Sequence, residues 1–189
     1  MSSHRTPSAV LFTVLLAASG LSSTAATAQT TITVCPSGCN HTSIQSAIDA
    51  AANGDVISIA AGVYNEVNLN PGGKAITIQG TLNGDGSLAT TIDATGAEDF
   101  FSRSVFTIAT GEGADTKIKD LVVTGGRGTG LDPWGEATAG GGFYCEGSSP
   151  TISGCTITGN SVSYEGGGIY CWNSSPTINR CTINGNSAG

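Results

Sequence analysis

The last fifty residues of the chain contain one sequence twice. Residues 140–165 read GGGFYCEGSSPTISGCTITGNSVSYE, and residues 166–189 read GGGIYCWNSSPTINRCTINGNSAG. The two copies align without a gap, so that matching glycines, cysteines, prolines and asparagines lie 26 residues apart. A repeat of this length indicates a structural unit that buries its apolar face only by stacking on the next unit.

Within each copy, apolar residues alternate with small polar residues over short spans, as in residues 151–153 and 155–158. This period is that of β-strands, and the intervening glycines and Ser-Ser-Pro segments are typical of turns. Helical periodicity is missing from the copies, which argues against leucine-rich, ankyrin and tetratricopeptide repeats. A meander of hairpins is an alternative, but identical residues at identical spacing stack best when every coil runs in the same direction. The repeats therefore favour a parallel β-helix.

The GGGIYC, SSPTI, CTI and GN elements resemble the repeats of right-handed parallel β-helix proteins of the pectate-lyase-like superfamily, in their bacterial secreted forms. The segment SIQSAIDAAANGDVISIAAGVYNE (residues 43–66) also resembles the amino-terminal region of pectin-esterase-like β-helix proteins, in which a helix precedes the first coil. The resemblance implies an all-β fold, a right-handed parallel β-helix or solenoid with a short N-terminal capping α-helix.

Residues 1–28 are predicted to be an export signal peptide. A short segment containing Arg5 precedes an apolar run over residues 9–18, and Ala26-Thr27-Ala28 offers a small-x-small cleavage site. The apolar run is shorter than the roughly 20 residues that span a bilayer. We therefore expect a secreted, extracellular or cell-surface protein with no transmembrane span after signal removal.

The mature chain is expected to form an N-terminal cap over residues 29–54 and β-helix coils over residues 55–189. The cap holds a strand at 31–34 and a helix that begins at Thr42 or Ser43 and stops at Asn53-Gly54. Such a helix would cover the open end of the first coil. The two clear repeats are 140–165 and 166–189.

Alternating segments between the cap and the repeats predict further strands at 90–94, 104–109 and 117–124. The longest stretches without a strand pattern are 98–103 and 125–139, which we expect to be loops on one face, where binding sites often form. No carboxyl-terminal cap follows the second copy, so we expect a truncated array whose end is covered by further coils or by a partner.

Composition limits the classes of partner. Seven basic and fourteen acidic residues give a formal charge of −7, which argues against nucleic acid. Charged residues make up only 11% of the chain, and its 28 glycines fit a turn-rich β-solenoid better than a disordered segment.

Six cysteines in an exported chain permit disulfides. Residues one coil apart in parallel strands lie roughly 4.8 Å from each other, inside the roughly 4.4–6.8 Å between Cα atoms that a disulfide accepts. A ladder of buried thiols that pack as small apolar residues is the alternative for the repeat cysteines. The pairs suggested by the spacing are Cys35–Cys39, Cys145–Cys171 and Cys155–Cys181.

The copies also indicate candidate ladder and ligand-binding residues. Asn160 and Asn186 occupy one turn of consecutive coils, where a structural ladder of amides is expected. Trp172 replaces Glu146 of the first copy, and strand alternation directs it outward, where an aromatic ring can stack on a sugar.

Three further residues are candidate ligand-binding positions. Tyr164 lies just before the second copy, and Trp134 lies in the segment 125–139 beside Asp132 and Glu136. Arg180 replaces a glycine of the first copy, and positions that differ between copies are where recognition can reside.

No catalytic residue is predicted. His41 is the one histidine that remains after signal removal, and it lies beside the cap helix, which argues against a histidine triad or a multi-histidine metal site. The lyases of the superfamily use an arginine or lysine base, and its esterases and polygalacturonases use close acidic pairs. Neither pattern is recognisable around Lys117, Lys119 or Asp120.

The sequence therefore predicts a secreted or surface-displayed module for adhesion or glycan binding, with a polysaccharide or cell-surface glycan as partner. No cofactor is expected, although the turn at residues 83–86 (NGDG) is a weak candidate for calcium that lacks the repeated acidic ligands. The alternative is the N-terminal part of a polysaccharide lyase or of a pectin-esterase-like carbohydrate-active enzyme.

Overall fold

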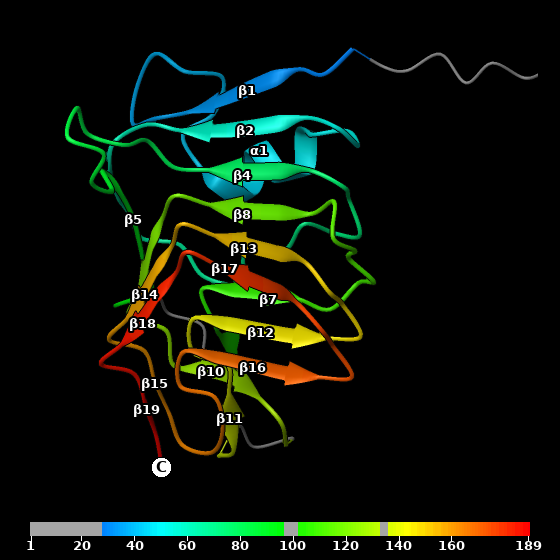
Figure 1. Cartoon of the computed structure of the whole chain (residues 1–189), viewed down its shortest axis with the longest axis vertical. Helices are drawn as coiled ribbons and strands as arrows, with labels where there is room; N and C mark the ends of the chain where they lie inside the picture. The colour runs from blue at the N-terminus through cyan, green and yellow to red at the C-terminus, as the bar shows by residue number, and fades with distance from the viewer. Residues whose placement is uncertain (1–27, 97–101, 133–135) are drawn as a thin grey trace, which may run out of the picture.

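A computed structural model describes residues 28–96, 102–132 and 136–189. Three parallel sheets surround one apolar core, and the chain passes through them in turn, which confirms the predicted parallel β-helix (Figure 1). The six-stranded sheet contains β1 (Thr31–Val34), β2 (Val56–Ile59), β4 (Thr77–Gln79), β8 (Lys117–Lys119), β13 (Thr151–Ser153) and β17 (Thr177–Asn179).

The other sheets continue the same stacking. The five-stranded sheet contains β3 (Gly62–Tyr64), β5 (Thr90–Asp93), β9 (Val122–Thr124), β14 (Thr156–Thr158) and β18 (Thr182–Asn184). The three-stranded parallel sheet contains β7 (Phe106–Ile108), β12 (Phe143–Glu146) and β16 (Ile169–Trp172). A short parallel pair, β15 (Ser161–Val162) and β19 (Ser187–Ala188), completes the last two coils.

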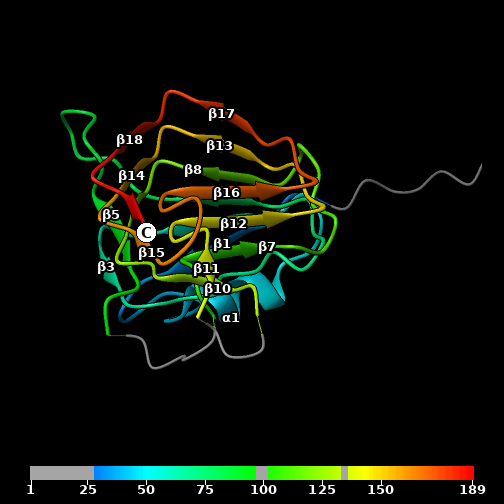
Figure 2. The ribbon, with the colours of Figure 1, turned by 90° about the horizontal axis from the view of Figure 1, so that it is seen from below.

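The register of the strands follows the sequence repeat. Strand β13 aligns Ile152 with Ile178 of β17, and β14 aligns Ile157 with Ile183 of β18. Ile152 and Ile157 are fully buried, whereas Ile178 and Ile183 are 41% and 49% exposed, because no further coil covers them in this structure. Figure 2 shows two of these stacks in one view, with β17, β13 and β8 in order from the top and β16, β12 and β7 in order below them.

Alternate residues of each strand fill the core. Isoleucines of β2, β4, β8 and β13 form one buried column at a single register position, and Phe106 stacks on Phe143 with ring centroids 4.9 Å apart. These residues repeat because each coil faces the same packing problem.

The cap helix is α1 (Ile44–Ala50), whose buried residues Ile44, Ala47 and Ile48 face the core. It begins after the predicted N-cap Ser43, but it ends earlier than the Asn53-Gly54 stop. The reason is that Ala51 adopts an extended conformation and Asp55 Oδ2 accepts a hydrogen bond from Ala52 N, which draws the chain out of the helix.

Two predictions for the middle of the chain need correction. The segment 117–124 is not one continuous strand: Asp120 has φ +59° and turns the chain between β8 and β9. The supposed loops 98–103 and 125–139 contain an antiparallel sheet of β6 (Ser102–Arg103), β10 (Gly128–Gly130) and β11 (Thr138–Ala139). Its Gly- and Thr-rich strands pair through the backbone and lack the apolar alternation that marks the other strands.

Cys35 and Cys39 form the predicted local disulfide, with Cα atoms 5.6 Å apart. Residues 1–27, which are all but the last residue of the predicted signal peptide, lie outside the described residues. Among the described residues, no helix is both long and apolar enough to cross a membrane.

Candidate functional site

The outer face of β12 and β16 carries an aromatic platform, which we define as Tyr144, Tyr170 and Trp172. Parallel pairing places Tyr144 opposite Tyr170 and Glu146 opposite Trp172. Because Phe143 and Cys145 are buried in the core, strand alternation directs Tyr144 and Glu146 away from it. Alternation along each strand and the pairing of β12 with β16 thus bring three aromatic rings and one carboxylate to the same side of the sheet.

The platform forms the floor of a groove of about 430 Å³, and β10 and the residue after it supply the remaining lining. The Tyr144 and Tyr170 rings stack with centroids 5.4 Å apart and an interplanar angle of 22°. Trp172 is 61% exposed at the end of β16. The lining residues are Gly130, Leu131, Tyr144, Glu146, Tyr170 and Trp172.

A hydrogen bond orders the polar part of this groove. The Tyr144 hydroxyl donates to Glu146 Oε2 at 2.9 Å. Burial, together with this hydrogen bond, raises the pKa of Tyr144 to about 12, so the phenol stays protonated at neutral pH. A carboxylate has several acceptor sites, so Glu146 retains the capacity to accept a hydrogen bond from a ligand hydroxyl.

The glycine triplet before each strand allows the two coils to approach closely at the platform. A Cβ atom at Gly141 would collide with the carbonyl oxygen of Gly167, and one at Gly142 would collide with that of Gly168. The GGG motif therefore serves stacking, and the strands that follow it carry the rings of the platform, of which Tyr144 is buried, Tyr170 is half-buried and Trp172 is exposed.

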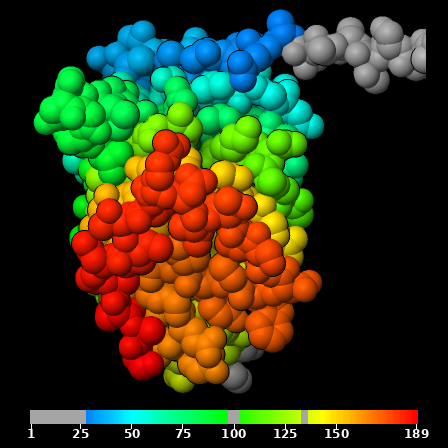
Figure 3. Space-filling model, in the orientation of Figure 1, coloured from blue at the N-terminus to red at the C-terminus, as the bar shows by residue number. Residues whose placement is uncertain are grey.

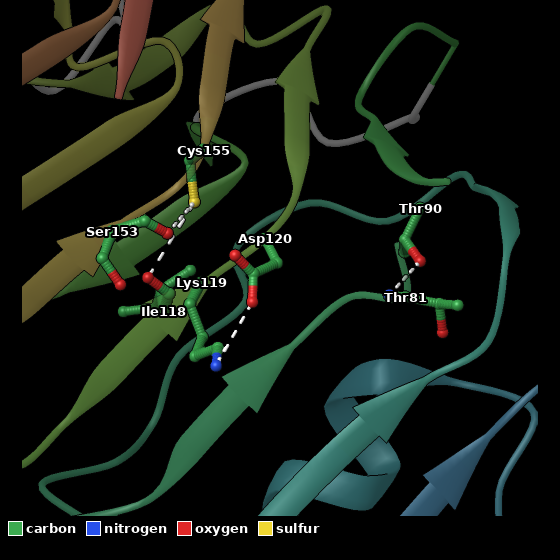
Figure 4. A network of polar contacts seen from close by, with 7 residues as sticks. All are labelled: Thr81, Thr90, Ile118, Lys119, Asp120, Ser153 and Cys155. Carbon is green, nitrogen blue, oxygen red and sulfur yellow. Dashed lines mark hydrogen bonds and ion pairs between the residues drawn. The ribbon is translucent and has the colours of Figure 1, made fainter. Parts of the chain in front are cut away.

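Arg180 lies in a second hollow, of about 610 Å³, between the six- and five-stranded sheets. Asp120, Gly154 and Arg180 occupy the same turn of three successive coils, and all three have positive φ values. Gly154 carries no side chain, so the hollow lies between the other two residues. Lys119 Nζ pairs with Asp120 Oδ2 at 3.2 Å (Figure 4), so the positive charge of the lysine is partly neutralised.

The remaining candidates are separate from the platform groove. Tyr164 is 51% exposed but does not line it, and Trp134 lies outside the described residues. Asn160 is fully buried; its Nδ2 donates to Asn186 Oδ1 at 2.9 Å, and its Oδ1 accepts from Gly126 N. The two asparagines therefore link adjacent coils.

The four cysteines of the repeats are free thiols in this structure. Cys145 and Cys155 are buried, Cys171 is exposed and Cys181 is half-buried. Figure 4 shows Cys155 Sγ directed at the carbonyl oxygens of Ser153 and Ile118, at 3.4 and 3.9 Å.

The histidine and the candidate calcium turn identified in the sequence are held by hydrogen bonds within the chain. His41 Nδ1 lies 3.0 Å from Ser46 Oγ, but this hydroxyl donates to the Ser43 carbonyl and is held within the cap. Asp85 of the candidate calcium turn accepts from the Ser87 amide and hydroxyl, and these bonds lower its pKa. No group of three or more potential metal ligands occurs among the residues described.

Sequence reasoning identified Trp172 but missed its partners Tyr144, Tyr170, Leu131 and Glu146 as one site. A signal was present for the tyrosines, since both copies place Tyr directly before the inward cysteine. Leu131 gave no such signal, because it reaches the groove through β10, which the sequence did not predict.

Comparison with protein-family models, curated proteins and solved structures finds no match to this chain. The assignment of the fold as a parallel β-helix rests on the strand order and the parallel pairing of its sheets.

Proposed function

We propose that the chain is a non-catalytic β-helix module of the pectate-lyase-like kind that binds a neutral polysaccharide or cell-surface glycan outside the cell. The observation that supports this proposal is the aromatic platform and the groove above it.

The shape and composition of the groove fit a sugar. Its volume of about 430 Å³ lies within the usual range of small-ligand sites, and its lining combines the apolar faces of aromatic rings with polar groups. The C–H face of a pyranose can pack on the Trp172 ring, while hydroxyls on its rim bond to Glu146. An exposed ring that is apolar on its face and polar on its edge suits such an amphipathic ligand.

Charge favours a neutral ligand. Glu146 lies in the groove, and the chain has a formal charge of −7. Both repel an anionic polymer unless a cation bridges them. We therefore infer that uncharged hexose or pentose polymers bind better than uronate or sulfated polymers.

The test is calorimetric titration of soluble neutral and anionic oligosaccharides, with and without calcium, alongside an assay for new chain ends. We expect saturable binding of a neutral glycan, no cleavage, and affinity that falls at least about tenfold in Trp172→Ala and Tyr170→Ala, because each loses a stacking surface.

Arg180→Gly is the matched control, since it removes an exposed side chain of the same coil outside the groove and restores the residue of the first copy. It should bind as the parent does. Chelator-sensitive cleavage of a polysaccharide would overturn the non-catalytic assignment in favour of a lyase or esterase. Binding that Trp172→Ala leaves unchanged would overturn the assignment of the groove.

A further inference from the structure

Two pairs of cysteines connect the last coil to the one before it. In the first pair, the register of β12 and β16 places Cys145 directly opposite Cys171. In the second, Cys155 and Cys181 each come one residue before strands that align Thr156 with Thr182, and Thr182 N donates to Cys155 O at 2.9 Å. Opposed residues of parallel strands lie roughly 4.8 Å apart, which is inside the Cα range for disulfides.

Each pair combines an accessible sulfur with a shielded one. Cys171 is exposed and Cys181 is half-buried, whereas Cys145 and Cys155 are buried. A hydrogen bond from Cys145 lowers the pKa of Cys171 to about 7, and one from Cys155 lowers the pKa of Cys181 to about 6. The same hydrogen bonds, together with burial, raise the pKa values of the two buried thiols. The accessible member of each pair is therefore the better nucleophile.

We propose that Cys145–Cys171 and Cys155–Cys181 are two redox modification sites, which a small-molecule disulfide such as glutathione disulfide converts into two vertical disulfides. The thiolate of Cys171 attacks one sulfur of glutathione disulfide, which breaks the S–S bond and releases one glutathione thiolate. Cys145 then attacks Cys171 Sγ in the mixed disulfide and releases the second glutathione. The two protons of the protein thiols end on the two glutathiones, and Cys181 and Cys155 react in the same way.

The two bonds would fasten the last two coils of the structure to each other. They join β12 to β16 and the start of β14 to the start of β18, while the apolar residues of the last coil are partly exposed. Figure 3 shows this coil, in orange and red, at the surface of the molecule. Reduction leaves the coil held by backbone hydrogen bonds, the asparagine link, hydrogen bonds of serine side chains and the stacking of Tyr170 on Tyr144.

Oxidation should also order the aromatic platform, a consequence for binding that rests on the proposed function. Cys171 lies between Tyr170 and Trp172 in β16, so a bond to Cys145 fixes Tyr170 against Tyr144 and Trp172 opposite Glu146. The oxidised form should bind the glycan more tightly than the reduced form.

The primary test does not use a glycan. The chain is fully reduced, exposed to excess glutathione disulfide, treated with N-ethylmaleimide, and analysed by intact mass and by peptide mapping without reduction. We expect no maleimide on the oxidised chain and linked peptides containing Cys145–Cys171 and Cys155–Cys181. Stable glutathione adducts, four alkylated repeat cysteines, or pairing of Cys145 with Cys155 would overturn the proposal.

Single-site variants separate the two bonds. In Cys171→Ser, the Cys155–Cys181 bond should still form while Cys145 remains a shielded thiol, and Cys181→Ser should give the converse result. If a variant fails to fold, the peptide map of the parent still decides the pairing.

Hydrogen exchange measures the structural effect of the bonds. Amides of residues 166–189 should exchange at least about tenfold more slowly in the oxidised form. Equal exchange in both forms would overturn the claim that the bonds fasten the coil. Correct pairing without any glycan affinity would contradict the proposed function alone.

Discussion

Removing the Asn160 side chain should destabilise the β-helix more than any equivalent change in the last coil. Its amide makes three bonds between separate segments: Nδ2 donates to Val123 O at 3.1 Å and to Asn186 Oδ1 at 2.9 Å, and Oδ1 accepts from Gly126 N at 2.9 Å. Each bond contributes about 1 kcal/mol net, and an orphaned buried N–H costs about 1–3 kcal/mol. Because Asn160 is fully buried, water cannot replace these partners. Asn160→Ala should therefore cost about 3–5 kcal/mol.

Urea unfolding monitored by circular dichroism measures this loss, with the cysteine oxidation state held constant. At a slope of about 2 kcal/mol per M urea, the midpoint should fall by at least about 1.5 M. The comparison variant is Asn186→Ala, which removes the bond to Ile157 O and the two bonds that Asn186 Oδ1 accepts from the backbone and side-chain amides of Asn160. Asn186 is only half-buried, so water can replace part of this loss, and the variant should cost about 1–2 kcal/mol less than Asn160→Ala. A free energy of unfolding within about 1 kcal/mol of the parent for Asn160→Ala, or equal losses in the two variants, would show that Asn160 is not the main buried link between coils.

Three other changes test separate parts of the fold. Glu66 accepts hydrogen bonds from the first turn of α1, so Glu66→Gln should cost about 1 kcal/mol in the same urea assay; an unchanged midpoint would contradict this capping role. Burial raises the pKa of Glu112, but hydrogen bonds from Thr110 and Gly73 lower it by more, so its net pKa lies below the usual value. The stability that ionised Glu112 contributes is therefore present above its unfolded pKa of about 4.3 and is lost as the pH falls through its folded pKa. Glu112→Gln should make the free energy of unfolding less dependent on pH in this acid range. An unchanged pH dependence would contradict this role of Glu112. Arg180 has φ +51°, so Arg180→Gly should relieve backbone strain and raise stability by up to about 1 kcal/mol, whereas a clear destabilisation would show that its side chain contributes contacts.

The sequence was most informative where the fold repeats. The aligned copies predicted the strand register that pairs Cys145 with Cys171, because equivalent residues of identical coils lie opposite each other in neighbouring strands. The cap helix was also predictable, since Ser43 and the apolar stripe after it encode its start. Its end was not, because Asp55 draws the chain out through a contact from beyond the helix.

The candidate site was only partly predictable. Alternation of inward and outward residues indicates that Trp172 faces solvent, but it does not reveal what lies beside it. Tyr144 and Tyr170 become neighbours only through the strand pairing, and Leu131 reaches the groove from an antiparallel strand made of glycine and threonine. A strand of this kind has no alternation of apolar and polar residues, so the sequence pattern does not predict it or its neighbours.

Fluorescence of Trp172 during glycan titration reports directly on whether the aromatic platform binds a sugar. A Trp134→Phe background makes Trp172 the one tryptophan of the chain, and a ring that stacks on a sugar changes its emission. We predict a saturable change with a neutral oligosaccharide, which disappears in Tyr170→Ala and persists in Arg180→Gly. No change across a panel of neutral glycans, or an equal change in the Tyr170→Ala variant, would contradict the assignment of the aromatic platform as a glycan-binding site.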